Sequence, residues 1–243
     1  MKPPNEILSD LPELTTRAVA HYWRTRTRQA TEQSVKGDTD RGSRAAVTGG
    51  AQMDGFLDLI ANYLRHIGIP ADCIHFHSRL ELPGFFRPTK KWDLLVVKDG
   101  QLVLALEAKS QVGSFGNNFN NRTEEAMGSA LDLWTAFREG ALNPTTRPWL
   151  GYLFLLQDCP ASNRPVRTEE PHFPVLPEFR DASYATRYES FCRKLVRERH
   201  YQAAAFLMSD DSLGREGQYR EPANDLTVNL FLRSLLGHAS AYV

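Results

Sequence analysis

The chain has 243 residues, of which 42% are apolar and 24% charged. This composition is that of an ordinary globular protein and excludes a disordered chain or a coiled coil. With 29 basic and 29 acidic residues the net charge is zero, which argues against a nucleic-acid partner only if the charges are evenly distributed. Three cysteines are too few for a disulfide framework or a zinc knuckle.

No apolar run approaches the roughly 18 residues that a membrane-spanning helix needs. The first residues also lack the charged, apolar and small-residue order of a signal peptide. We therefore expect a cytoplasmic protein with no membrane partner. The sequence has no G-x-x-x-x-G-K-[ST] loop, so we expect no use of ATP by this chain.

The N-terminal part of the chain is predicted to be basic and partly helical. Residues 13–30 carry an apolar stripe at helical spacing. Residues 31–50 are polar and dotted with glycine, which predicts a long exposed loop. Residues 17–44 contain seven Lys or Arg and three acidic residues. The zero net charge thus hides a local positive excess in this segment.

The middle of the chain predicts a helix followed by β-structure. Residues 51–67 place apolar side chains on one helical face, and residues 73–82 predict a strand. Two apolar runs, 92–98 and 102–109, flank Asp99-Gly100, which is a strong hairpin signal. Both runs are apolar on both faces, so we expect the hairpin in the centre of a sheet.

The whole pattern predicts an α/β fold with a central mixed β-sheet flanked by helices. We expect one domain over residues 1–243, with a core at about 51–157, an N-terminal basic helix and loop at 13–50, and helical and strand additions at 158–243. The other predicted elements are a loop at 113–121, a helix at 122–138, a strand at 149–156, an irregular proline-rich segment at 158–182, a helix at 184–199, a strand at 201–208 and a helix near 224–237.

Asp93, Glu107 and Lys109 are the candidate catalytic residues. Glu107-Ala108-Lys109 is the one D/E-x-K match in the chain, and about 0.8 matches are expected by chance, so the count alone proves nothing. The location is more telling, because Asp93 opens one apolar strand while Glu107 and Lys109 close the next. Residues two apart in a strand share a face, so Glu107 and Lys109 point the same way.

Whether Asp93 joins them depends on the turn of the hairpin. A loop with an odd number of residues, such as Lys98-Asp99-Gly100 with a glycine bulge, puts Asp93 on the same face. A two-residue Asp99-Gly100 turn sends Asp93 to the opposite face. The hypothesis therefore makes a definite demand on the strand register.

Two carboxylates and a lysine at a strand end suit phosphodiester hydrolysis. Carboxylates bind Mg²⁺, which takes oxygen ligands, neutralises charge at the phosphate and lowers the pKa of water. The lysine positions or deprotonates the attacking water and adds positive charge. The alternative is a structural ion pair, since such pairs also cluster charges at strand ends.

Asp93 with Glu107-Ala108-Lys109 in this setting resembles the PD-(D/E)xK nuclease core. The segments AVTGGAQMDGF (46–56), RTEEPHFPVLPEF (167–179) and ASYATRYESFCRKLVRERHY (182–201) are similar to the XhoI-type restriction endonucleases. The residue before Asp93 is tryptophan where the motif has proline, and that proline has no chemical role.

The resemblance implies a Type II enzyme that binds Mg²⁺ and cuts both strands of double-stranded DNA at the palindrome CTCGAG, leaving 5′ overhangs, as part of a restriction-modification system. It implies that Asp93, Glu107 and the backbone carbonyl of Ala108 hold the metal. A palindromic target also implies a C₂ homodimer. Two alternatives stay open: a less specific nuclease of the same core that acts in repair or recombination, and a catalytically inactive DNA-binding protein.

Two basic or amide-rich segments are candidates for DNA contact, because arginine and asparagine bind both base edges and phosphates. Residues 87–122 hold six basic residues and three acids. If these segments do not contact DNA, the basic N-terminal segment is a solvated helix face and the Asn-rich segment is a simple turn. The candidate residues are Arg24, Arg28, Lys36, Arg41, Arg44, Asn117, Asn118, Asn120, Asn121 and Arg122.

Three residues of the first core helix are weighed as helpers of the metal site. Helical geometry places Asp54 and Asp58 opposite the apolar face, so solvent-facing side chains are expected. Gln52 lies on the inward side and is a candidate to support the site indirectly.

Overall fold

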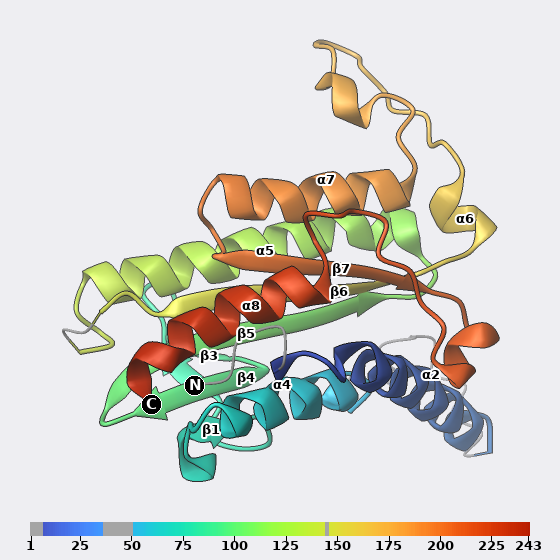
Figure 1. Ribbon diagram of the computed structural model, residues 1–243. Helices are drawn as coiled ribbons and strands as arrows, with labels where there is room; N and C mark the ends of the chain where they lie inside the picture. Colours follow the sequence, from blue (N-terminus) through green and yellow to red (C-terminus); the bar gives the residue numbers. More distant parts are fainter. Residues whose placement is uncertain (1–6, 36–50, 144–145) are drawn as a thin grey trace.

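A five-stranded mixed sheet forms the centre of the protein (Figure 1). The computed structural model describes residues 7–35, 51–143 and 146–243. The strand order is β1-β4-β5-β6-β7, antiparallel from β1 to β5 and parallel from β5 to β7. The elements are α2 (Leu11–Val35), α4 (Asp54–His66), β1 (Ile74–His75), β2 (Glu81–Pro83), β3 (Thr89–Lys91), β4 (Leu94–Lys98), β5 (Gln101–Gln111), α5 (Phe115–Arg138), β6 (Trp149–Gln157), α6 (Pro160–Asn163), α7 (Tyr184–Arg197), β7 (Ala203–Ser209) and α8 (Val228–Ala239).

Helices cover both faces of the sheet, which confirms the predicted architecture. Buried side chains of α2, α4 and α8 pack with Leu94 and Val96 on one face. Those of α5 and α7 pack with Leu95 and Tyr152 on the other. Because both faces are covered, β5 and β6 need apolar residues at nearly every position, as the sequence indicated.

The segment predicted as one strand over residues 73–82 is broken, and this prediction was wrong. A 3₁₀ turn (Ala71–Cys73) leads into the two-residue β1, and Arg79 has a positive φ of 58° that interrupts extended structure. The chain then forms β2, which pairs with β3 in a separate two-stranded sheet. This small hairpin runs directly into Asp93.

Helix α5 begins at Phe115, so the prediction of a loop over residues 113–121 was also wrong. Phe115 and Phe119 are four residues apart, which is helical spacing, and both pack into the α5/α7 layer. The asparagines at 117, 118, 120 and 121 therefore lie on the outer side of the first turns of α5.

At the N-terminus, α2 continues to Val35, five residues beyond the predicted end of the helix at residue 30. The rest of that predicted loop, residues 36–50, lies outside the described residues. The proline-rich segment is irregular apart from the one-turn α6 and a 3₁₀ turn (Pro177–Phe179), and part of it projects beyond the start of α7 (Figure 1). None of the described helices is both long and apolar enough to cross a membrane.

Candidate active site

The strand register brings Asp93 to the same face of the sheet as Glu107. Lys98 pairs with Gln101, so the turn is the two-residue Asp99-Gly100 form, with φ of 51° and 72° as a type I′ turn requires. A regular ladder from this turn would place Asp93 opposite Leu106. Of the two turns that the sequence left open, the hairpin therefore contains the two-residue one and not the three-residue loop with a glycine bulge.

A β-bulge inside β5 supplies the one extra residue that brings Asp93 to the face of Glu107. The register shifts between Val96 and Val97, so that Val96 pairs with Leu104 and Val97 with Leu102. Val103 is the extra residue, and Val103 and Leu104 both face the α2/α4/α8 layer. After the bulge Leu94 pairs with Leu106.

Continuing this register from the Leu94–Leu106 pair, Asp93 lies opposite Glu107 and on its face of the sheet. The prediction that a two-residue turn would send Asp93 to the opposite face was therefore wrong, because it did not include the bulge. The backbone N–H of Ala108 donates to Asp93 Oδ2 at 2.8 Å, and that of Asp93 donates to the Leu106 carbonyl at 3.1 Å. Asp93 is thus tied to β5 by both its backbone and its side chain.

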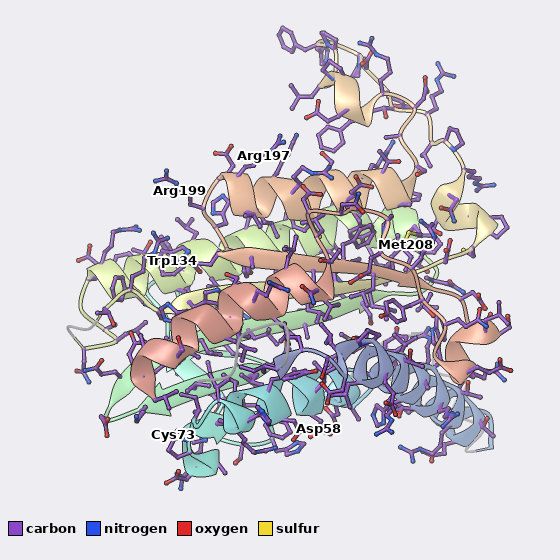
Figure 2. All side chains as sticks on the ribbon, in the orientation of Figure 1. Asp58, Cys73, Trp134, Arg197, Arg199 and Met208 are labelled. Atoms are coloured by element: carbon purple, nitrogen blue, oxygen red, sulfur yellow. The ribbon has the colours of Figure 1, made fainter. Side chains whose placement is uncertain are left out.

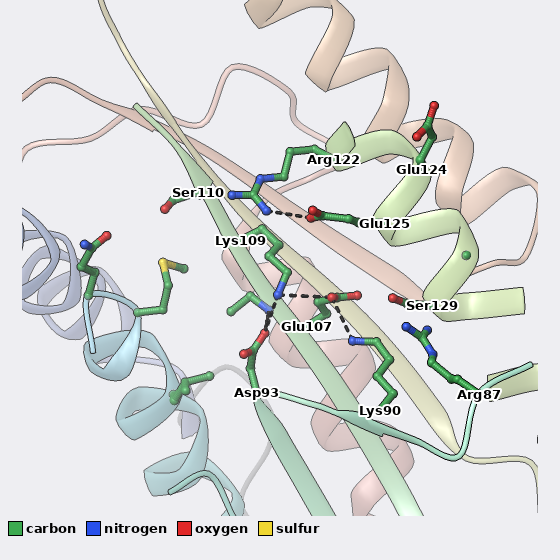
Figure 3. Close-up of a pocket in the computed structure, with 15 residues that line it drawn as sticks. Arg87, Lys90, Asp93, Glu107, Lys109, Ser110, Arg122, Glu124, Glu125 and Ser129 are labelled. Atoms are coloured by element: carbon green, nitrogen blue, oxygen red, sulfur yellow. Dashed lines mark hydrogen bonds and ion pairs between the residues drawn. The ribbon is translucent and has the colours of Figure 1, made fainter. Parts of the chain in front are cut away.

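The three predicted residues line one cavity of about 540 Å³ at this end of the hairpin (Figure 3). Its walls come from the N-terminal part of α4, the β2–β3 hairpin, β5 and the first half of α5. The lining residues are Gln52, Met53, Leu57, Arg87, Lys90, Asp93, Glu107, Ala108, Lys109, Ser110, Arg122, Glu124, Glu125, Gly128 and Ser129.

Lys109 bridges the two carboxylates. Its Nζ lies 3.3 Å from Asp93 Oδ2 and 3.2 Å from Glu107 Oε1. The Glu107 side chain is only 3% exposed, whereas Asp93 is 34% exposed. One carboxylate is therefore held inside the protein and the other faces the cavity.

Two residues that the sequence did not single out complete the surroundings of Glu107. Lys90 Nζ lies 3.1 Å from Glu107 Oε1, the same oxygen that Lys109 contacts (Figure 3). It also lies 4.3 Å from the centre of the Trp92 ring. The Tyr201 hydroxyl lies 3.1 Å from Glu107 Oε2 and 3.0 Å from the Ala126 carbonyl, so its proton is shared between two acceptors.

These contacts fix the charge states of Glu107 and Lys109. Burial opposes ionisation of Glu107, but Lys109 and Lys90 outweigh it and hold the pKa of this carboxyl below its usual value. Burial likewise disfavours the charged form of Lys109, but Glu107 and Asp93 outweigh it and raise the pKa of the ammonium group. At neutral pH the pair is an ionised carboxylate and a protonated lysine.

The oxygen atoms of the site suit a hard divalent cation. Asp93 and Glu107 supply carboxylates, and the N–H and C=O of one strand residue point the same way, so the Ala108 carbonyl is directed to the side where Asp93 lies. Within the described ranges, no group of three or more His, Cys, Asp or Glu side chains could hold a metal ion. Any metal here would need backbone oxygen and water besides the two carboxylates.

The three predicted helpers, Gln52 just before α4 and Asp54 and Asp58 on it, differ in their exposure. Asp58 is exposed and points away from the sheet (Figure 2). Asp54 is half-buried, so the prediction of a solvent-facing side chain was wrong for this residue. Burial is the main reason that its pKa is raised, with a smaller contribution from the charge of Asp93. Gln52 is buried, lines the cavity and donates to Gln29 Oε1 at 2.6 Å.

The candidate DNA-binding residues of the N-terminal segment are only partly within the described chain. Arg24 and Arg28 lie on α2, where Arg24 Nε donates to the Arg215 carbonyl and Arg28 lies 4.0 Å from Glu32. Neither lines the cavity. Lys36, Arg41 and Arg44 lie outside the described residues.

The second group of candidates lies on α5 rather than in a loop. Asn117, Asn120 and Asn121 are exposed on its first turns, and Asn118 Nδ2 donates to the Ser114 carbonyl within the same helix. Arg122 does line the cavity and lies 2.7 Å from Glu125. The structure thus brings Arg122, but not these asparagines, to the candidate site.

Lys90, Arg87 and Tyr201 were missed because no local pattern marks them. Lys90 and Arg87 stand in a breaker-rich segment that gave no element prediction, and Tyr201 is 94 residues from Glu107 in the chain. The one available signal was the positive excess over residues 87–122, which includes Lys90 and Arg87.

Comparison with known proteins places the chain in a family. A family model described as restriction endonuclease XhoI matches residues 32–221. The chain is 56% identical over 207 residues to the type II restriction enzyme BstVI of Geobacillus stearothermophilus, with 83% of this chain and 92% of that enzyme covered.

Two further relatives are similar. The type II restriction enzyme XhoI of Xanthomonas vasicola is 48% identical over 195 residues, covering 78% of this chain and 77% of that enzyme. The type II restriction enzyme AbrI of Azospirillum brasilense is 48% identical over 168 residues, covering 68% and 75%. No solved structure gives a significant match. The mixed sheet is consistent with a PD-(D/E)xK core, and the match over residues 32–221, together with these identities, shows that the chain belongs to the XhoI family of type II restriction endonucleases.

Proposed function

We propose that this chain is a Mg²⁺-dependent endodeoxyribonuclease that cuts both strands of the palindrome CTCGAG and leaves 5′ overhangs. One observation carries the proposal. Asp93, Glu107 and Lys109 line one cavity, and the Lys109 ammonium group lies within 3.3 Å of both carboxylates. The target follows from the similarity to enzymes of the XhoI family. We further propose that residues 1–243 form one restriction-endonuclease domain.

Asp93, Glu107 and the Ala108 carbonyl would hold the metal. All three offer oxygen, the donor that Mg²⁺ prefers. When bound, Mg²⁺ supplies positive charge at the scissile phosphate and makes water more acidic. Asp93 is ready for this role because the Ala108 N–H already fixes the direction of its carboxylate.

Lys109 would act on the water and on the phosphate. Its ammonium group donates hydrogen bonds and faces the cavity with 25% of its side chain exposed. A fixed positive donor in a partly buried site stabilises the charge that develops on phosphate oxygens. Glu107 keeps this ammonium group in place and is itself held by Lys90 and Tyr201.

Two arginines at the rim of the cavity are candidates to contact the phosphates of the substrate. Arg122 lines the cavity on the side of α5, and Arg87 lines it on the side of the β2–β3 hairpin. Contacts of this kind bind phosphates and set the position of the duplex without reading its sequence. Because a palindrome presents two equivalent phosphates, we propose a C₂ homodimer with one cavity per strand.

The experiment is digestion of a plasmid of known sequence in the presence of Mg²⁺, followed by sequencing of the cut ends. Discrete fragments ending at CTCGAG with 5′ extensions are expected, and a plasmid that lacks the site should stay intact. A smear of fragments would favour an unspecific nuclease, and a DNA complex without any cleavage would favour a binding protein. Either of these two results overturns the proposal.

A further inference from the structure

Two phenylalanine side chains are exposed on the loop that joins β2 to β3. Phe85 is 50% exposed and Phe86 is 66% exposed. Their rings contact each other edge to face, with centroids 4.9 Å apart. Together they form a small apolar surface, which we call the Phe85–Phe86 tip. Large apolar side chains exposed next to each other on a loop commonly mark an interaction site.

The Phe85–Phe86 tip is held rigidly by a buried carboxylate. Asp132 on α5 accepts hydrogen bonds from the backbone N–H of Phe85 at 2.8 Å and of Phe86 at 2.9 Å. Its other oxygen accepts from Arg87 Nε at 2.7 Å, and the Asp132 side chain is only 4% exposed. Gly84 completes the turn, since a Cβ there would lie 2.7 Å from Asp132 Oδ2.

The hairpin beneath the tip is anchored in the core. Leu80, Leu82 and Trp92 are buried in the α5/α7 layer, and the Trp92 N–H donates to the Leu80 carbonyl at 2.9 Å. The two phenylalanine side chains are therefore exposed on a firmly held loop. A rigid apolar tip loses little conformational entropy when it binds a partner.

The tip stands at the rim of the candidate active site. Arg87 follows it directly in the chain, and Lys90 is four residues beyond Phe86. Both line the cavity that holds Glu107. A substrate that reaches Glu107 over this rim would thus pass the two phenylalanine rings.

The charges around the tip indicate what kind of partner it binds. Residues 79–91 carry four basic side chains and one acidic side chain, which suits a polyanion. DNA combines phosphates with apolar base surfaces, and proteins that bend DNA insert such apolar side chains between base steps. A second copy of this chain fits less well, because a tip on a two-fold axis would face its own positive charges.

We propose that the Phe85–Phe86 tip contacts the bases of the DNA duplex beside the cleaved phosphate. This inference rests on the proposed function, since it takes the DNA to be the substrate of the cavity. Arg87, which follows the tip directly and lines the cavity, then contacts a phosphate beside the tip, while the rings contact or separate the neighbouring base step.

The test compares the double variant Phe85→Ala/Phe86→Ala with Leu230→Ala. Leu230 is a matched control, because it is 47% exposed but lies on α8, in the helical layer on the other face of the sheet. Binding is measured by fluorescence anisotropy in the Lys109→Ala background, with a short duplex containing CTCGAG and a 2-aminopurine beside the cut site. Oligomeric state is measured by sedimentation.

The double variant should bind the duplex about tenfold more weakly or worse than the control, as loss of aromatic contact with bases predicts. The rise in 2-aminopurine fluorescence on binding should also be lost, while the salt dependence of binding stays unchanged because no cationic group is removed. Affinity within twofold of the control would overturn the inference.

Conversion of a dimer into a monomer by the double variant would also overturn it, because the tip would then cover a second copy. Failure of the proposed function gives a different result. In that case the wild-type chain does not cut CTCGAG plasmids, whatever the phenylalanine variants do.

Discussion

The backbone N–H of Ala108 donates a 2.8 Å hydrogen bond to Asp93 Oδ2. This contact links the residue just before β4 to the part of β5 that extends past the β4 ladder. Lys109 Nζ lies 3.3 Å from the same oxygen. The direction of the Asp93 carboxylate is therefore set by the protein before any cation or substrate binds, which is the kind of preorganisation that catalysis by charge stabilisation requires.

Replacing Lys109 by alanine should abolish most cleavage. The variant loses the positive donor between Asp93 and Glu107, and loss of one such donor commonly costs roughly 10² to 10³ in rate. Single-turnover cleavage of a CTCGAG duplex measures the effect, and circular dichroism checks that the fold is intact. Cleavage at the normal rate would show that the assignment of Lys109 is wrong.

Tyr201→Phe should lower the free energy of unfolding by about 1–3 kcal/mol, because Glu107 Oε2 then loses its donor inside the protein. Tyr188→Phe is the matched control. Tyr188 is also fully buried, but its hydroxyl has no hydrogen-bond partner among the described residues, so its removal should cost nothing. Urea unfolding of the two variants measures the difference, and equal stabilities would contradict the role given to Tyr201.

Lys90→Met should destabilise the protein, whereas Lys91→Met should not. Lys90 is 12% exposed and pairs with the buried Glu107, and a hydrogen bond to a charged group contributes about 1.5–3 kcal/mol. Lys91 is exposed, and exposed substitutions change stability by about 0.5 kcal/mol or less. Cleavage should also slow in Lys90→Met alone. Thermal unfolding of both variants, with their cleavage rates, tests the pair, and equal behaviour would place Lys90 outside the site.

Asp132→Asn should show a pH-dependent loss of stability. Burial opposes ionisation of Asp132, but hydrogen bonds from Phe86, Arg87 and Phe85 outweigh it and hold its pKa below the usual value of an aspartate. A carboxyl with a lowered pKa in the folded protein stabilises it fully above its unfolded pKa, and this stabilisation is lost as the pH falls through the folded pKa. The variant should be about 1–3 kcal/mol less stable at neutral pH. Denaturant unfolding at several pH values should show this gap closing below about pH 4. A gap that does not change with pH would contradict the charged state of Asp132.

The sheet was predictable because its strands are long apolar runs bounded by clear turn residues. The same-face position of Glu107 and Lys109 followed from the two-residue period of a strand alone. Asp93 was less certain, because its face depends on a bulge at Val103, and no local residue preference marks that bulge. The apolar pattern of β5 fits either register, and the choice is made by packing on two faces.

The start of α5 and the outer parts of the site depend on contacts that are distant in sequence. Phe115 and Phe119 carried a helical signal, but the asparagines between and after them favour turns and concealed it. Tyr201 reaches Glu107 only because β7 lies two strands from β5 in the sheet. Lys90 becomes part of the site through a two-stranded hairpin too short for a periodic pattern.

The bulge at Val103 divides the hairpin into two parts with independent register. The pairs near the turn obey the two-residue Asp99-Gly100 geometry, while the pairs near the site keep Asp93 opposite Glu107. A chain that lacked one residue at Val103 would form a regular ladder with the same turn and would still bring its aspartate to its glutamate. A change of one residue in the separation between Asp93 and the Glu107-Ala108-Lys109 sequence therefore leaves both the turn and the shared face of the site unchanged, provided that the bulge is gained or lost with it.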